Sequence, residues 1–235
     1  MGLINDFIKI LSSDEYVGYL FKGFGSTLIV TLIAAVIGLV LGIVIAIIKI
    51  LSVENKYLKL PALICEIYTT IIRGTPVALQ MFIMVFVLFA IPGFKPYAVI
   101  LTFGFNSGAY VSESIRAGIL SVDKGQTEAG RALGLSQMQT MFKIVIPQAI
   151  KNVIPAIGNE LIALVKETAI IAIVGVKPGD ITWELNKAME TISKGIGGSY
   201  LAPSILVGIL YLIIVYAITF IIKLIEKRLR ASDQR

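Results

Sequence analysis

The sequence has 235 residues, of which 57 % are hydrophobic and only 15 % are charged, and its mean hydropathy is +0.88. A soluble domain carries about 25 % charged residues, so this composition excludes an ordinary soluble globular protein. The chain contains no His and one Cys, which excludes His-based catalysis, disulfide frameworks and the usual zinc sites. Its net charge of +6 is interpreted as a membrane-topology signal, not as a sign of nucleic-acid binding.

The clearest predicted membrane span lies near the start of the chain. Residues 24–48 carry no charge, and a helix of about 20 residues suffices to cross the hydrocarbon core. Residues 1–23 carry charges of both signs and lack the features of a signal peptide. We therefore expect an N-terminal interfacial segment over 1–23, a single transmembrane domain over 24–226 and a tail over 227–235.

A second apolar block, residues 57–91, is too long to be one straight span, because it would extend about 50 Å at 1.5 Å per residue. The sequence Arg73-Gly74-Thr75-Pro76 predicts a break, since Pro76 lacks an amide donor and disfavours helical geometry at Thr75. Together with these two blocks, three further spans predict an all-α integral membrane protein of about five transmembrane helices. The further spans are expected over residues 96–120, 152–176 and 201–222.

The predicted loops divide into two sides that carry unequal basic charge. The side that includes the C-terminal tail holds 13 Lys and Arg residues, and the other side holds 6. Because positively charged loops stay in the cytoplasm, we predict a cytoplasmic tail and an N-terminus outside. A second crossing within the apolar block would invert only the first span and its flanks, so charge alone leaves a six-span alternative open.

The most specific pattern lies in the loop between the third and fourth predicted spans. Glu128-Ala129-Gly130 is followed by three residues, then Gly134, then nine residues and Ile144-Val145-Ile146-Pro147. This spacing resembles the EAA loop of ABC-transporter permeases, with Gly130 in place of Ala and Ile146 in place of Leu. Other segments resemble the polar amino-acid permeases of binding-protein-dependent importers, namely residues 73–76, 112–119, 158–160 and 166–168.

The resemblance implies a type I ABC importer permease with a cytoplasmic coupling helix inside residues 123–147. It also implies three partners: an ABC ATP-binding subunit, an extracytoplasmic solute-binding protein, and a second permease that is either identical or a sister chain. Small side chains in the loop would let another backbone approach closely, although a plain surface helix is the alternative. The predicted ATPase-coupling residues are Glu128, Ala129, Gly130, Arg131, Ala132 and Gly134.

The chain itself is predicted not to be an enzyme. It contains no phosphate-binding loop of the pattern Gly-x-x-x-x-Gly-Lys-Ser/Thr. We therefore expect no cofactor on this chain, with ATP and magnesium held by the partner ATPase.

Two acidic residues of the fourth span are the main candidates for contacting a substrate. A charge within the hydrocarbon core is costly, so an intramembrane carboxylate suggests a function. Glu160 and Glu167 lie seven residues apart and share one helix face. Glu160 is expected near the midplane, where it would bind the ammonium or guanidinium group of an amino acid. The alternative is a buried ion pair with Arg73 or Lys166 that only stabilises the bundle.

The third span and the helix break supply further candidates. Asn106 and Tyr110 belong to a small, polar stretch of an apolar helix, where such residues either bind substrate or only pack helices together. Thr75 and Gln80 lie beside the break, and broken helices expose backbone groups to ligands.

One charged pair in the third span is predicted to be structural. Glu113 and Arg116 lie three residues apart near the end of the span, and helical side chains at this spacing form ion pairs. We therefore do not include them among the substrate residues.

These features predict a permease subunit, in a bacterial cell membrane, of an ATP-driven importer of polar amino acids. The acidic intramembrane residues favour cationic substrates such as arginine, lysine or histidine. One alternative is a secondary transporter or channel driven by an ion gradient, with Glu160 and Glu167 as proton sites. Another is a membrane scaffold without transport. The sequence leaves open which amino acid is carried and whether the permease dimer contains one kind of chain or two.

Overall fold

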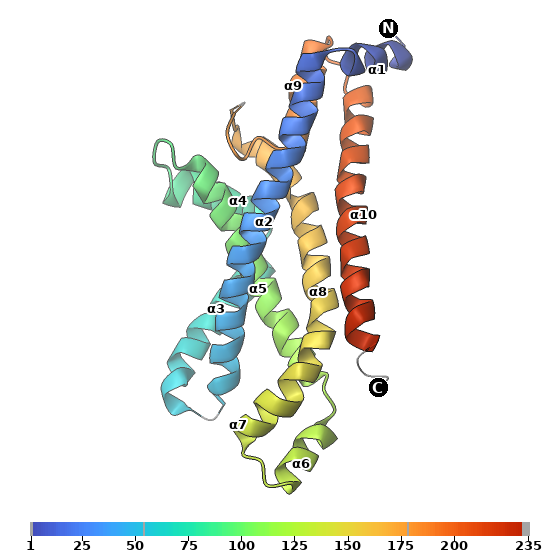
Figure 1. Ribbon diagram of the computed structural model, residues 1–235. Helices are drawn as coiled ribbons and strands as arrows, with labels where there is room; N and C mark the ends of the chain where they lie inside the picture. The colour runs from blue at the N-terminus through green and yellow to red at the C-terminus, as the bar shows by residue number, and fades with distance from the viewer. Residues whose placement is uncertain (1, 54, 178, 232–235) are drawn as a thin grey trace. The chain divides into compact units, whose positions relative to one another are not determined.

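The computed structural model describes residues 2–53, 55–177 and 179–231, and every regular element within them is helical (Figure 1). Short π-helical or 3-10 stretches adjoin several α-helices, and Met141–Val145 joins α7 to α8 without a gap. The α-helices are α1 Leu3–Leu11, α2 Asp14–Leu51, α3 Lys59–Gly74, α4 Val77–Ile83, α5 Lys95–Leu120, α6 Lys124–Ala132, α7 Gln137–Thr140, α8 Ile146–Glu167, α9 Leu185–Gly195 and α10 Leu201–Ala231.

The helices belong to two compact units, which we describe separately. Unit 1 comprises the chain up to Val36, Thr75–Gly104 and Ile162–Ala217. Unit 2 comprises Ile37–Gly74, Phe105–Leu161 and the chain from Ile218 onward. The long helices α2, α5, α8 and α10 each contribute residues to both units.

The predicted spans correspond to α2, the broken pair α3 and α4, α5, α8 and α10. By length and apolar composition alone, α2 and α10 qualify as membrane spans, and the broken pair counts as a third. Helices α5 and α8 are 26 and 22 residues long, but polar side chains interrupt their apolar sequences. Length and hydropathy therefore identify the most apolar helices as spans, but not α5 and α8, which carry Asn106, Tyr110, Glu160 and Glu167.

Two helix boundaries differ from the sequence-based expectation, each for a local reason. Helix α2 begins at Asp14, not at residue 24, because the apolar pattern continues backwards and Asp14 and Glu15 complement the helix dipole in the first turn. Helix α8 ends at Glu167, and the apolar residues Thr168–Val174 form a 3-10 stretch that Gly175 ends at φ 65°.

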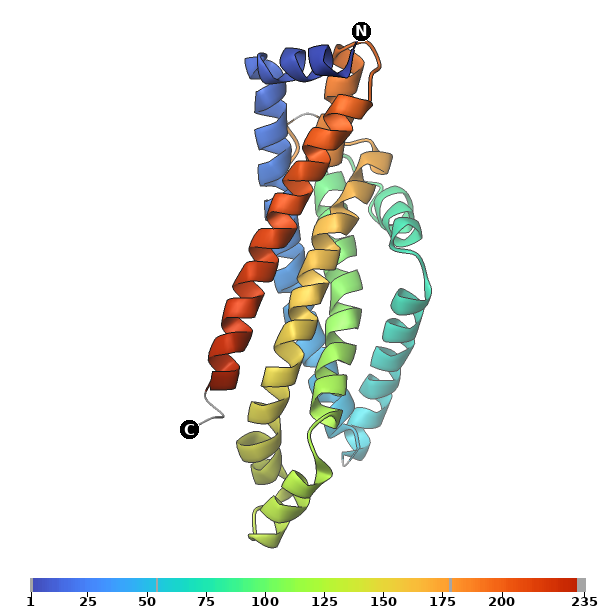
Figure 2. The same ribbon diagram turned by 90° about the vertical axis from the view of Figure 1, so that its right-hand side faces the viewer.

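Unit 1 includes the packing of α9 against the first half of α2. Figures 1 and 2 show α1 running from the N-terminal end of α2 toward that of α10, and Asp6 on α1 accepts a hydrogen bond of 2.7 Å from Ser199. Helix α9 approaches α2 closely at Gly23, where a Cβ atom would lie 3.1 Å from Ala188. Trp183, which precedes α9, is buried and packs edge-on against Tyr19 with ring centres 5.4 Å apart.

Unit 2 contains a close approach between the second half of α2 and α5. A Cβ atom at Gly38 would lie 2.6 Å from the Ser107 hydroxyl, and one at Gly42 would lie 2.6 Å from Val111. These glycines therefore allow α2 and α5 to pack with their backbones near each other. In both views α6 and α7 form the tip of this unit, beyond the ends of α3 and α5 (Figures 1 and 2).

Candidate coupling and substrate sites

The EAA loop folds as a short helix, α6, with well-defined ends. Asp123 caps its N-terminus by accepting a hydrogen bond of 2.6 Å from the Gly125 amide. At the other end the Leu135 amide donates to the Gly130 carbonyl at 3.1 Å, and Gly134 adopts φ 82°. This is the glycine-containing helix end expected at Gly134, because few other residues tolerate a positive φ.

Most of the predicted coupling residues lie on the surface of α6. Glu128, Ala129, Arg131, Ala132 and Gly134 are exposed, whereas Gly130 is buried. A Cβ atom at Gly130 would lie 2.8 Å from Thr140 and 2.9 Å from Ile144, so the departure from Ala in the EAA pattern fits tight packing beneath α6. Gly130 therefore packs on the inner side of α6. The other five residues form an exposed surface, which we call the knob.

Sequence reasoning missed the apolar part of this tip. Leu133 is 82 % exposed, and Met138 and Phe142 are 48 % and 61 % exposed. Exposed large apolar side chains grouped near a short helix are typical of a partner-binding surface. The available signal was Leu133, a large apolar residue next to the helix-ending Gly134.

At the helix break, the structure joins two of the predicted substrate residues within unit 1. The Gln80 side-chain amide donates to the Thr75 carbonyl at 3.0 Å and to the Thr75 hydroxyl at 2.9 Å. Helix α3 ends at Gly74 and α4 begins at Val77, so the break falls where Pro76 predicted it. Gln80 is buried, and its hydrogen bonds stabilise backbone that the break leaves without helical partners.

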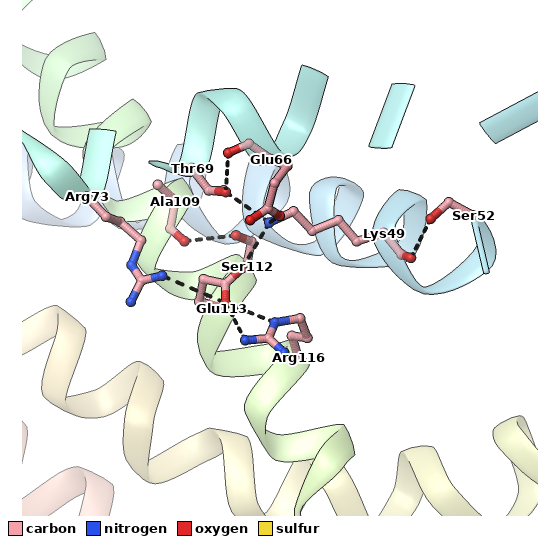
Figure 3. Close-up of polar contacts among 9 residues, drawn as sticks. All are labelled: Lys49, Ser52, Glu66, Thr69, Arg73, Ala109, Ser112, Glu113 and Arg116. Atoms are coloured by element: carbon pink, nitrogen blue, oxygen red, sulfur yellow. Dashed lines mark hydrogen bonds and ion pairs between the residues drawn. The ribbon is translucent and has the colours of Figure 1, made fainter. Parts of the chain in front are cut away.

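A cluster of five charged residues joins α2, α3 and α5 in unit 2 (Figure 3). Lys49, whose side chain is 9 % exposed, lies 2.7 Å from Glu66 and 2.9 Å from Glu113, and it also donates to the Thr69 hydroxyl at 2.9 Å. Arg116 Nη2 lies 2.8 Å from Glu113 Oε2, which confirms the ion pair predicted from the spacing of these two residues. We call Lys49, Glu66, Arg73, Glu113 and Arg116 the ionic cluster.

Arg73 belongs to this cluster through a longer contact. Its Nη1 atom lies 3.8 Å from Glu113 Oε2, and its guanidinium carbon lies 5.5 Å from the centre of the Tyr110 ring. The ion pair that the structure gives for Arg73 is with Glu113, on α5. Lys49 was also missed, although a single charge at the end of a long uncharged run was a visible signal.

The small, polar stretch of α5 divides between packing and possible binding. Ser107 faces Gly38, and Gly108 lies against Leu41, so these two residues serve the contact with α2. Asn106 is buried at 3 % exposure, whereas Tyr110 is 36 % exposed and stacks with Arg73. The packing interpretation thus holds for Ser107 and Gly108, and Tyr110 remains accessible.

Helix α8 carries both predicted carboxylates, and Glu160 lies in unit 2 while Glu167 lies in unit 1. Both side chains are partly buried. A cavity of about 900 Å³ in unit 2 is lined by residues of α5 and α8, among them Asn152 and Ala156. Ala156 is four residues before Glu160, so the face that carries Glu160 continues into this cavity.

Unit 1 contains a fully buried carboxylate that sequence reasoning did not single out. Glu184 caps α9, accepting hydrogen bonds from the amides of Asn186 at 2.7 Å and Lys187 at 3.0 Å. The Tyr211 hydroxyl donates a third at 2.7 Å. Burial raises the pKa of Glu184 to about 7, although these three hydrogen bonds oppose the rise.

The described residues combine a broken candidate span, partly buried carboxylates on α8 and a short exposed loop helix, which are features of a membrane permease. Residues 38–231 match the family described as "binding-protein-dependent transport system inner membrane component", and the chain belongs to this family. It is a multi-pass membrane permease subunit, and ATP hydrolysis belongs to a separate subunit of such systems. The match favours ATP-driven import over the ion-gradient and scaffold alternatives.

Two curated relatives cover most of the chain. It is 42 % identical over 173 residues to the arginine transport system permease protein ArtQ of Bacillus subtilis, spanning 72 % of this chain and 76 % of the relative. It is 34 % identical over 173 residues to the glutamine transport system permease protein GlnP of Escherichia coli, spanning 70 % and 74 %.

Solved structures agree on the fold. A crystal structure of an amino acid ABC transporter with histidines has a chain that superposes with a TM-score of 0.80 at 34 % identity, covering 93 % of this chain and 98 % of that one. An inward-facing structure of the MetNI methionine ABC transporter gives a TM-score of 0.73 at 23 % identity, covering 92 % and 99 %. The second likeness concerns the fold alone.

Proposed function

We propose that this chain imports a cationic amino acid as one of two permease subunits, identical or sister chains, in an ATP-driven complex. The complex would also contain two ATP-binding subunits, which hold ATP and magnesium, and a solute-binding protein outside the membrane. The match to the family over residues 38–231 is the observation that carries the proposal. The names of the arginine and glutamine relatives support a polar amino acid as the substrate.

The exposed knob on α6 is the proposed docking site for the ATP-binding subunit. Its rim carries Glu128 and Arg131, its small residues permit close backbone approach, and Leu133 supplies apolar area. The same proposal places the α6 end of unit 2 and the C-terminal tail in the cytoplasm and the N-terminus outside, consistent with the unequal basic charge of the loops.

Glu160 is the proposed contact for the positive group of the substrate, with Asn106 and Tyr110 as the further candidates in unit 2. Glu167, Thr75 and Gln80 are the separate candidates in unit 1. The cavity beside Ala156 supports this assignment, because it offers a ligand bound at the Glu160 face of α8 a space into which it can be released. A carboxylate on this partly buried face attracts an ammonium or guanidinium group more strongly than it would in water.

The test is uptake by proteoliposomes that contain the permease together with an ATP-binding subunit and a solute-binding protein from the same organism. We expect uptake of labelled arginine, lysine or histidine to require an active ATPase, and uptake that persists with an inactive one would contradict the proposal. Glu160→Gln is expected to lower uptake of the cationic substrate at least tenfold, as loss of a charged hydrogen bond predicts. Glu15→Gln, at an exposed carboxylate of α2, is the matched control.

Docking is tested separately by co-purification. Glu128→Lys is expected to detach the ATPase by reversing the charge at the rim of the knob. Asp14→Lys makes the same charge reversal at an exposed residue outside the EAA loop, and it should leave co-purification unchanged. Normal recovery of the ATPase with Glu128→Lys would remove α6 from the docking surface.

A further inference from the structure

The ionic cluster of unit 2 carries one more positive than negative charge. It contains the cations Lys49, Arg73 and Arg116 and the carboxylates Glu66 and Glu113. An uncompensated charge within a membrane domain is costly, so a further anion would be stabilised there. The contacts within the cluster show which of the three cations is the most available to bind this anion.

Glu113 is already satisfied by two of the cations. Its Oε1 atom accepts from Lys49 at 2.9 Å, and its Oε2 atom lies 2.9 Å from Arg116 Nε and 2.8 Å from Arg116 Nη2. Arg73 reaches the same carboxylate only through Nη1 at 3.8 Å, which is beyond hydrogen-bond distance. Arg73 is therefore the cation with the weakest hold on the cluster.

The guanidinium of Arg73 is also presented for binding. The Arg73 side chain is 44 % exposed, and Figure 3 shows the remaining guanidinium nitrogens directed away from Glu113. Its carbon lies 5.5 Å from the centre of the Tyr110 ring, so the ring supports one face of the group and leaves its edge available. A guanidinium held in this way binds planar carboxylates through two parallel N–H groups.

The position of Arg73 fits the proposed pathway. It lies in the last turn of α3, directly before the helix break, where the dipole of the helix favours a cation. Tyr110 lies four residues after Asn106 on α5, so Arg73 meets α5 beside two of the proposed substrate residues. Glu160, the proposed contact for the positive group of the substrate, belongs to the same unit as Arg73.

We infer that Arg73 binds the α-carboxylate of the transported amino acid, with Tyr110 holding the guanidinium in place. The inference rests on the proposed function, since it names the group that would bind the end of the substrate opposite the cationic side chain. The α-carboxylate is common to all amino acids, so Arg73 would recognise the class of substrate, and other residues would select its side chain.

The test measures binding of ligands that differ only in the carboxylate. The permease in complex with its ATPase, in lipid nanodiscs, is titrated calorimetrically with L-arginine and L-argininamide, and with L-glutamine and L-glutaminamide. We expect the unmodified protein to bind each acid at least about tenfold more tightly than its amide, as expected for a hydrogen-bonded charge pair. In Arg73→Gln this preference should vanish through weaker binding of the acid, with the affinity for the amide unchanged.

Arg116→Gln is the matched control. Arg116 is similarly exposed, at 47 %, and pairs with the same Glu113, but it is fully engaged there. It should retain the preference for the acid. Arg73→Lys keeps the charge and loses the forked geometry, so an intermediate preference is expected, and this variant also guards against a folding defect in Arg73→Gln.

The inference is overturned if Arg73→Gln weakens acid and amide equally, or if Arg116→Gln removes the preference to the same degree, because Arg73 would then act only within the ionic cluster. It also fails if the unmodified complex binds none of the four ligands. ATP-dependent uptake by the complete transporter would still support the proposed function in that case, so the two failures are distinguishable.

Discussion

The two units each contain a buried or nearly buried carboxylate, and they compensate it in opposite ways. Glu113 in unit 2 is 15 % exposed and is surrounded by Lys49, Arg116 and Arg73. Glu184 in unit 1 is fully buried and accepts hydrogen bonds from two backbone amides and the Tyr211 hydroxyl. Full charges surround the first carboxylate, whereas only neutral hydrogen-bond donors contact the second, and burial raises the pKa of Glu184 to about 7 against the effect of those donors.

The difference matters because each arrangement responds to a different perturbation. The ionic cluster links three helices through charges whose removal leaves other charges unpaired. The Glu184 site links the start of α9 to α10 through hydrogen bonds that depend on proton occupancy. Charge substitution should therefore disturb unit 2 most, and pH should disturb unit 1 most.

The largest expected effect is that of Glu113→Gln. This change leaves the buried Lys49 with Glu66 and removes the shared partner of both arginines, which we expect to cost about 3 kcal/mol of unfolding free energy. The measurement is the loss of monodisperse protein in gel filtration after heating. Glu66→Gln, which removes a 64 % exposed carboxylate from the same lysine, should cost less than about 1 kcal/mol. Equal losses would mean that burial of the cluster does not decide its contribution.

A smaller effect is expected from titration of Glu184. The folded protein keeps this proton up to about pH 7, whereas the unfolded chain releases it above 4.5. The folded state thus binds more protons between these values, so unfolding free energy should fall by about 2 kcal/mol as pH rises from 5 to 7 and change little above that.

The fluorescence of Trp183, the neighbouring residue, reports this unfolding as a function of pH. In Glu184→Gln the pH-dependent fall should disappear, because the amide does not titrate. A fall that persists in this variant would assign it to another group.

The smallest effect is expected at Glu190 on the surface of α9. Glu190 pairs with Lys187 at 2.5 Å and with Lys194 at 2.6 Å, and hydrogen bonds from these lysines lower its pKa. Such partly exposed pairs contribute little, so Glu190→Gln should cost about 0.5 kcal/mol and should lose even this effect in 1 M salt. A cost that matches Glu113→Gln would show that exposure does not separate the two kinds of ion pair.

Local features of the sequence were sufficient to predict much of the fold. The long apolar runs predicted α2 and α10, Pro76 predicted the break after α3, and the spacing of Glu113 and Arg116 predicted their ion pair. Each of these depends on residues close together in the chain. The EAA spacing likewise located α6, because its glycine and cap residues act within one helix.

The features that sequence reasoning missed depend on distant residues. Lys49 and Glu113 are 64 positions apart, and nothing local indicates that the end of α2 approaches α5 there. Glu184 resembled an ordinary charge in a polar outer segment, because its partner Tyr211 lies 27 positions away on α10. Gly38 and Gly42 were a usable signal for close packing of α2, but they do not name the helix that packs against them.

The single tryptophan and the single cysteine of the chain lie in different units. Trp183 is buried against Tyr19 in unit 1, and Cys65, a free thiol of intermediate exposure on α3, belongs to unit 2. Unit 1 therefore contains the one intrinsic indole fluorophore of the sequence, and unit 2 contains its one thiol for attaching a dye. A spectroscopic signal from either residue can thus be assigned to one unit without any engineered residue.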